Sequence, residues 1–136
     1  MGNIRIYLTL LSLLSTTFIF AQQKSVFKAE IDAFRKQDSI QAPPSDPILF
    51  VGSSSFTRWK TIQKDLPGYT ILNRGFGGSS LTDVIQFVDE TIIKYKPKQI
   101  YIYCGENDLA NDATVTPEIV VERYQKLHSM IRKALG

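Results

Sequence analysis

A single cysteine, Cys104, occurs in the sequence, so no disulfide bond can form within the chain. Internal repeats and low-complexity tracts are also absent. Neither a Gly-x-Gly-x-x-Gly fingerprint nor a Gly-Lys-Ser/Thr phosphate loop occurs, which makes nucleotide binding the weakest functional hypothesis. At 136 residues the chain can form one small globular domain, held together by its hydrophobic core. We expect Cys104 to be a small residue of that core, in a predicted strand.

Only one long apolar run occurs, and it lies at the N-terminus. Ile6 to Phe20 is almost unbroken, Arg5 is the only charged side chain before it, and the small residue Ala21 follows. Ser and Thr interrupt the run, which is shorter than the roughly 20 apolar residues of a membrane-spanning helix. We therefore expect residues 1–21 to be a signal peptide cleaved near Ala21. The mature protein would be secreted or periplasmic, without a membrane span.

Positive charge is not concentrated in the way that nucleic-acid binding requires. The formal net charge is +3, and removal of Arg5 with the signal peptide lowers it by one. The densest basic stretch, Lys94, Lys96 and Lys98, falls where a helix is predicted to end, and cations there complement the helix dipole. We expect a solvated helix end at this stretch and no nucleic-acid partner.

Strand and helix patterns alternate three times after the signal peptide. Apolar runs predict strands at 48–51, 69–72 and 99–103. Apolar residues at helical spacing predict helices over 27–39, 56–66 and 81–95, and a last helix that Thr116 caps and Pro117 begins. This alternation predicts an α/β domain with a parallel sheet and right-handed crossovers. With the strand order 2-1-3, the first strand lies between the other two.

Three loops follow the carboxyl ends of the predicted strands, where ligands bind in such sheets. In chain order they are Gly52-Ser53-Ser54-Ser55, Asn73-Arg74-Gly75-Phe76-Gly77-Gly78 and Gly105-Glu106-Asn107-Asp108. A serine at a helix N-terminus, a glycine N–H and an asparagine amide are each useful in acyl transfer. Singly, each loop is explained by a helix cap, a tight turn or an Asx turn. Their joint order indicates an ester or acyl transfer site.

From about Ile48 to Asp108 this joint pattern resembles the SGNH (GDSL-like) hydrolase family, which has a Gly-Asp-Ser block, a glycine block and a Gly-x-Asn-Asp block. The resemblance implies that Ser54 is the nucleophile, and that Gly78 and Asn107 are donors to the oxyanion. It further implies a three-layer flavodoxin-like fold and a serine esterase or lipase that needs no cofactor and no metal. The substrate would be a small-molecule or carbohydrate ester, with carbohydrate acetyl esters as one class.

Two departures from the family pattern affect the expected activity. Ser53 stands where the family has Asp, and the family's late Asp-x-x-His does not occur. The only histidine is His128, which lies 12 residues past Thr116 and so about 18 Å along the last helix. A general base must come within about 3 Å of its partner, so we expect an incomplete, inactive hydrolase. A fragment of a longer protein is one explanation, and a degenerate natural product is the alternative.

The predicted organisation is thus a signal peptide (1–21), an N-terminal helix and connector (22–47) and a partial SGNH hydrolase domain (48–136). A second functional hypothesis uses the same crevice without catalysis. In that case Arg58, Trp59 or Arg74 would contact a sugar or an anion. Binding that survives loss of the Ser54 hydroxyl would favour it.

Overall fold

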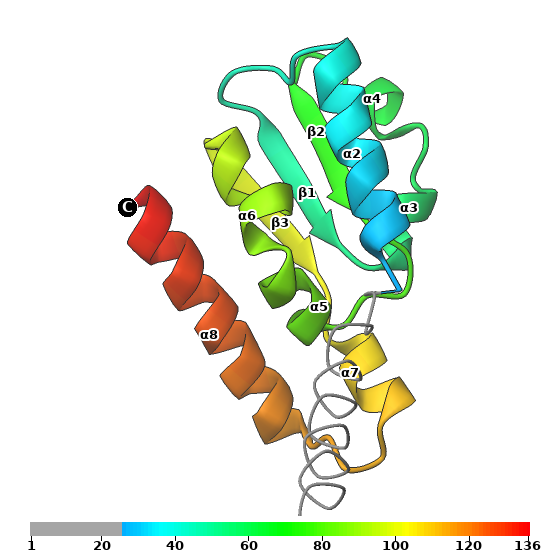
Figure 1. Ribbon diagram of the computed structural model, residues 1–136, viewed down its shortest axis with the longest axis vertical. Coiled ribbons are helices and arrows are strands. Elements are labelled where there is room, and N and C mark those ends of the chain that lie inside the picture. The colour runs from blue at the N-terminus through cyan, green and yellow to red at the C-terminus, as the bar shows by residue number, and fades with distance from the viewer. Residues whose placement is uncertain (1–25) are drawn as a thin grey trace, which may run out of the picture.

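The computed structural model describes residues 26–136, so the predicted signal peptide lies outside the described residues. Figure 1 shows the arrangement of the elements. In chain order they are α2 (Lys28–Ile40), β1 (Ile48–Gly52), α3 (Ser54–Arg58), α4 (Ile62–Asp65), β2 (Ile71–Gly75), α5 (Leu81–Gln86), α6 (Val88–Thr91), the 3-10 helix η2 (Ile93–Tyr95), β3 (Gln99–Tyr103), α7 (Glu106–Asn111) and α8 (Pro117–Leu135).

The three strands form one parallel sheet in the order β2-β1-β3, which confirms the predicted order. The register is even across the sheet, because Gly52 at the end of β1 pairs with Gly75 of β2 and with Tyr103 of β3. All three strands therefore end at the same level. Their carboxyl ends point toward α7 and the start of α5 (Figure 1).

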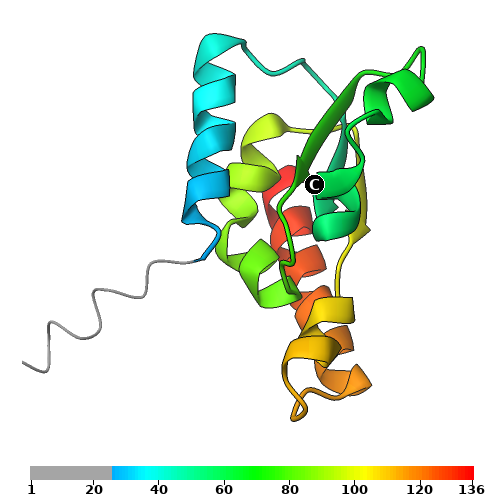
Figure 2. The same ribbon diagram turned by 90° about the vertical axis from the view of Figure 1, so that its right-hand side faces the viewer.

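Helices cover both faces of the sheet, which gives the predicted three layers (Figures 1 and 2). The larger core lies between the sheet and α2, α5, α6 and α8, and includes Leu49, Val51, Leu81 and Leu127, all fully buried. On the opposite face, α3 and α4 cover a smaller cluster around Phe50. The main hydrophobic burial thus falls on one side of the sheet, and it fixes the elements from which the loops emerge.

The helix predicted over 81–95 is broken into α5, α6 and η2. Thr91 gives a local reason, because its hydroxyl donates a 2.8 Å hydrogen bond to the carbonyl of Phe87, a contact that tends to bend helices. The helix predicted over 56–66 is also broken, into α3 and α4. There Asp65 accepts hydrogen bonds from the Trp59 indole and the Thr61 hydroxyl, both at 2.6 Å, and this holds the intervening turn.

Three further predictions differ from the structure in their details. The second strand covers 71–75 rather than 69–72, so Arg74 belongs to β2 and the glycine loop begins at Phe76. The loop after β3 contains a short helix, α7, and Cys104 lies just after β3 rather than inside it. In contrast, β3 and the Thr116-capped start of α8 are as predicted.

Candidate active site

Backbone hydrogen bonds join the first loop to both of its neighbours at the carboxyl edge of the sheet. The Ser53 N–H donates to the Tyr103 carbonyl, and the Phe76 N–H donates to the Gly52 carbonyl, each at 2.9 Å. Gly52 has φ +133°, and a Cβ atom there would lie 2.0 Å from the Tyr103 oxygen. Only glycine fits at this point. The structure therefore brings together the three loops that the sequence singled out.

Ser54 is the first residue of α3 and is half-buried, with Ser53 as the N-cap before it. Among the described residues its hydroxyl has no hydrogen-bond partner. A serine hydroxyl without an adjacent base is a weak nucleophile near neutral pH. The position of Ser54 fits the predicted role, while the group that would activate it is not found in this part of the chain.

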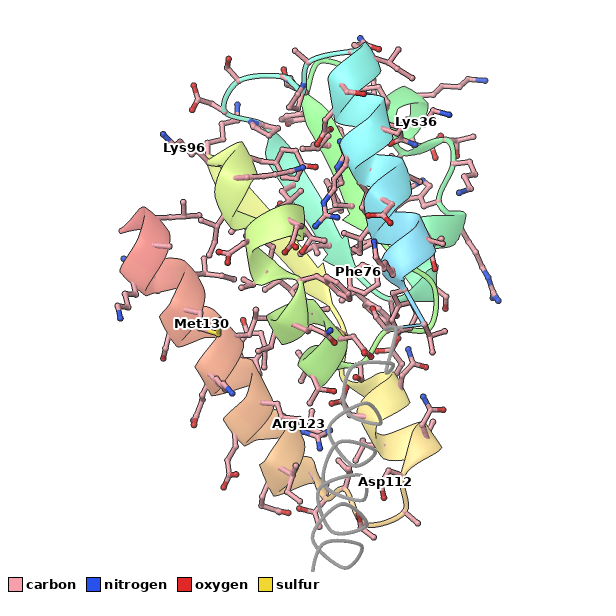
Figure 3. All side chains as sticks on the ribbon, viewed as in Figure 1. Lys36, Phe76, Lys96, Asp112, Arg123 and Met130 are labelled. Atoms are coloured by element: carbon pink, nitrogen blue, oxygen red, sulfur yellow. The ribbon has the colours of Figure 1, made fainter. Side chains whose placement is uncertain are left out.

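The glycine loop is held from an unexpected side, by the N-terminal helix α2. The Gly77 N–H donates a 3.0 Å hydrogen bond to the Glu30 carboxylate. Phe76, which Figure 3 labels between α2 and α5, makes an edge contact with Phe27 at a centroid distance of 5.2 Å. Gly78 follows as an exposed residue with φ +73° and open space around it. Glycine is thus favoured at the predicted donor position by its backbone conformation.

Asn107 lies in the first turn of α7, and its side-chain amide donates a 3.1 Å hydrogen bond to the Ser79 carbonyl. The next residue, Asp108, is buried and anchors the helix. Its carboxylate accepts a 2.8 Å hydrogen bond from the Leu81 N–H at the start of α5. It also pairs at 2.7 Å with Arg123 of α8, which Figure 3 labels. The third loop is therefore fixed against the glycine loop. The catalytic roles of Ser54, Gly78 and Asn107 stay predictions.

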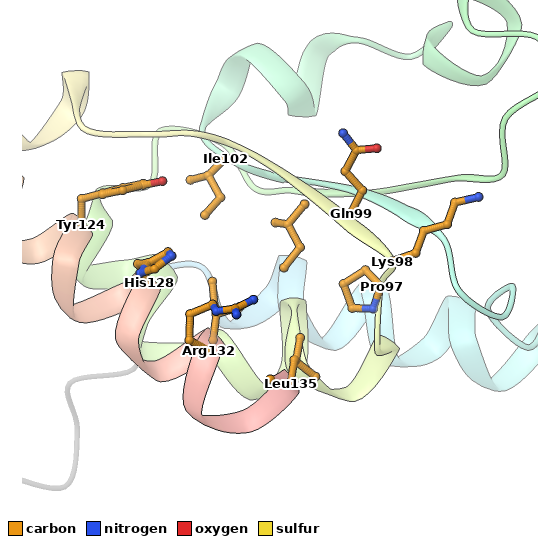
Figure 4. Close-up of a pocket in the computed structure, with 11 residues that line it drawn as sticks. Pro97, Lys98, Gln99, Ile102, Tyr124, His128, Arg132 and Leu135 are labelled. Atoms are coloured by element: carbon orange, nitrogen blue, oxygen red, sulfur yellow. The ribbon is translucent and has the colours of Figure 1, made fainter.

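His128, the only histidine, lies away from these loops. It is exposed on α8, stacks on Tyr124 with ring centroids 6.5 Å apart, and lines a groove between α8 and β3 (Figure 4). No residue of the three loops lines that groove. The structure thus agrees with the expectation that His128 is too distant to be the base.

Cys104 lies beside the site but is not a reactive thiol. Burial, followed by the negative charges of Asp108 and Glu106, raises its pKa to about 12. Its sulfur contacts the Ser79 carbonyl at 3.4 Å. Since the thiolate is the nucleophilic form of cysteine, this side chain stays protonated and inert near neutral pH.

Arg74, one candidate for anion or sugar binding, is occupied inside the protein. The guanidinium is buried between the rings of Phe34 and Tyr95, at 5.0 and 4.9 Å from their centroids. It also pairs with Asp38 of α2 at 2.5 Å. Trp59 is likewise engaged, through Asp65. The binding hypothesis therefore keeps only the exposed Arg58 without such contacts among the described residues.

Residues 26–136 contain no group of three or more side chains placed to hold a metal ion. Within the same residues, no helix combines the length and the apolar character needed to cross a lipid bilayer.

No protein-family profile matches the sequence, and no curated protein matches it significantly. Solved structures do match. A protein from Streptococcus pneumonia described as a platelet activating factor is similar with a TM-score of 0.63 and 18% identity, over 92% of this chain and 55% of that one. A protein from Parabacteroides merdae described as a GDSL-like lipase is similar with a TM-score of 0.52 and 16% identity, over 67% of this chain and 56% of that one.

This chain thus spans little more than half the length of either matched structure. At such identities the likeness concerns the fold. The three-stranded parallel sheet in the order β2-β1-β3, with helices on both faces, is the arrangement that the sequence resemblance implied. The described part of the chain therefore has the SGNH/GDSL-like hydrolase fold.

Proposed function

We propose that this site belongs to a secreted serine ester hydrolase in which Ser54 attacks the ester carbonyl. The observation that carries the proposal is the meeting of three loops at the carboxyl edge of the sheet. They supply, in chain order, a serine at the start of a helix, a glycine of positive φ and an asparagine amide. That set provides a nucleophile and donors to an oxyanion, which is what acyl transfer needs.

In the proposed reaction, the Ser54 oxygen forms a bond to the carbonyl carbon and the carbonyl oxygen becomes negatively charged. The backbone N–H groups of Ser54 and Gly78 and the Asn107 amide donate hydrogen bonds to that oxyanion. The alcohol then leaves as the tetrahedral intermediate collapses, and water hydrolyses the acyl-enzyme. The Ser54 proton must pass through a base to the leaving alcohol, and the described residues place none there.

The substrate class is a finer proposal that rests on the resemblance alone. Secreted hydrolases of this fold that act on carbohydrate acetyl esters would meet their substrates outside the cell. The apolar run before Ala21 supports that location. We propose a small-molecule or carbohydrate ester as the substrate.

Residues 1–136 alone are expected to hydrolyse p-nitrophenyl acetate no faster than their Ser54→Ala variant. A serine hydrolase that lacks one of its catalytic Ser, His and Asp residues keeps a rate acceleration of only about 10³ to 10⁴ over the reaction in water. The oxyanion hole and substrate binding supply this residual acceleration. The measurement is the initial rate of p-nitrophenol release for both proteins at equal concentration. Rapid turnover that disappears in Ser54→Ala would show that a base is present after all.

A further inference from the structure

A carboxylate from the third loop reaches the residue next to the proposed nucleophile. The Ser53 hydroxyl donates a hydrogen bond to Oε1 of Glu106. Ser53 is 0% exposed, whereas Glu106 is an exposed residue at the first position of α7. The contact thus joins a buried hydroxyl to a carboxylate 53 residues further along the chain.

Ser53 uses its hydroxyl in an unusual way for its place in the chain. It is the N-cap of α3, and an N-cap serine normally accepts a hydrogen bond from the backbone of the helix that it caps. Here the Ser53 side chain makes no such capping bond. The hydroxyl is directed across to Glu106 instead, where a charged acceptor gives a stronger hydrogen bond than a neutral one.

The same carboxylate oxygen also approaches the predicted oxyanion donor. Nδ2 of Asn107 lies 3.4 Å from Glu106 Oε1 and 3.1 Å from the Ser79 carbonyl. One oxygen atom of Glu106 therefore lies between the residue that precedes Ser54 and the amide of Asn107. An acidic side chain at the start of a helix is also favoured by the helix dipole alone. That preference explains neither the contact with Ser53 nor the contact with Asn107.

We propose that Glu106 is a positioning residue that supplies, from the third loop, the carboxylate that Ser53 does not carry at the family's Asp position. It orients the N-cap of α3 and the Asn107 amide relative to each other, and so sets the geometry between nucleophile and oxyanion donor. The role of Glu106 in catalysis rests on the proposed esterase function of the site. The contact itself is independent of turnover.

The inference predicts that an aspartate at position 53 can replace the carboxylate of Glu106. In Ser53→Asp, two carboxylates would meet at a buried position, and like charges in contact disfavour the folded state. Adding Glu106→Gln removes one charge and offers an amide N–H to the new carboxylate. The double variant should therefore recover most of what Ser53→Asp loses.

The experiment compares thermal unfolding of the original chain, Ser53→Asp, Glu106→Gln and the double variant, with Glu122→Gln as a control for the loss of one exposed acidic charge. We expect Ser53→Asp to lower Tm by about 4–8 °C or more, and the double variant to regain most of that loss. Glu122→Gln should give no rescue when combined with Ser53→Asp. Equal Tm values for Ser53→Asp with and without Glu106→Gln would overturn the proposal.

A spectroscopic readout separates positioning from stability alone. In ¹H–¹⁵N spectra the side-chain amide of Asn107 should shift in Glu106→Ala, while that of the exposed Asn111 at the end of α7 stays in place. If Ser53→Asp does not fold, this variant still decides the matter, because an unmoved Asn107 amide contradicts the proposal. None of these measurements uses ester turnover, so the esterase assignment and the positioning role can fail separately.

Discussion

The Gly52→Ala variant is expected to lose about 4 kcal/mol or more of unfolding free energy. Its Cβ atom would lie 2.0 Å from the carbonyl oxygen of Tyr103 and 2.8 Å from the carbonyl carbon. Both are backbone atoms of the paired strand β3, so no side-chain rotation can relieve the overlap. A positive φ adds strain of about 1–3 kcal/mol. Losses of this size have few causes, and Gly52→Ala combines two of them: a steric overlap with backbone atoms and backbone strain.

Urea denaturation of Gly52→Ala beside Gly68→Ala measures the effect. Gly68 also has a positive φ, +84°, but nothing lies within 4 Å of a Cβ atom there. The control should therefore show only the conformational cost of the positive φ, about 1–3 kcal/mol. If both variants unfold at the same urea concentration, the close approach of β1 and β3 at the site is not as the structure describes.

Asp38→Asn is expected to lower the unfolding free energy by about 3 kcal/mol, because it leaves a buried guanidinium without its carboxylate. Arg74 has 7% side-chain exposure and Asp38 13%, and their atoms are 2.5 Å apart. Lys94 and the Tyr95 hydroxyl also bond to Asp38, each at 2.6 Å. The Asp38 carboxylate thus joins α2 to β2, through Arg74, and to η2, through Lys94 and Tyr95.

The pH dependence of stability should change with the same substitution. Burial alone would raise the pKa of Asp38, but hydrogen bonds from Lys94 and Tyr95 and the charge of Arg74 outweigh it and lower the pKa. A lowered native pKa means that the contribution is present above the unfolded-state value, near 3.9, and is lost as the pH falls through the native value. Asp38→Asn should therefore flatten the acid limb of the stability profile.

Asp32→Asn is the matched control, since Asp32 lies on the same helix and pairs with Lys28 and Arg35 at an exposed position. Exposed ion pairs contribute little, so this variant should unfold close to the unchanged protein at pH 7. Equal losses for the two aspartates would contradict the claim that Asp38 stabilises the fold by pairing with the buried Arg74.

Local sequence patterns predicted the elements whose signals are themselves local. The run Gln99–Tyr103 and the pair Thr116-Pro117 mark β3 and the start of α8 within a few residues of chain. The strand order 2-1-3 belongs to the fold that the family resemblance implies, and the structure confirms it. The signals for β3 and for the start of α8 depend only on residues that are neighbours in sequence, and the structure confirms both.

The missed features depend on contacts between residues far apart in sequence. Glu30 reaches Gly77 across 47 positions, and Glu106 reaches Ser53 across 53. The sequence predicts Arg74 in a loop, whereas it belongs to β2 and pairs with Asp38, which lies 36 positions earlier. No periodicity marks such pairs, although a buried charge always requires a partner. Glu106 could have been suspected as a carboxylate within the asparagine loop, whereas nothing in the sequence places Glu30 near Gly77.

The central proposal is that Ser54 lies among the proposed oxyanion donors, with no base beside it among residues 26–136. Imidazole can test this proposal by taking the place of the base. The chain is incubated with p-nitrophenyl acetate with and without imidazole, and acetylation is mapped by mass spectrometry of peptides. We predict an acetyl group on Ser54 that depends on imidazole and is weaker in Asn107→Ala, with Ser55 as the internal comparison. Acetylation of Ser54 that is equally fast without imidazole, or no faster than that of Ser55 with it, would contradict the account.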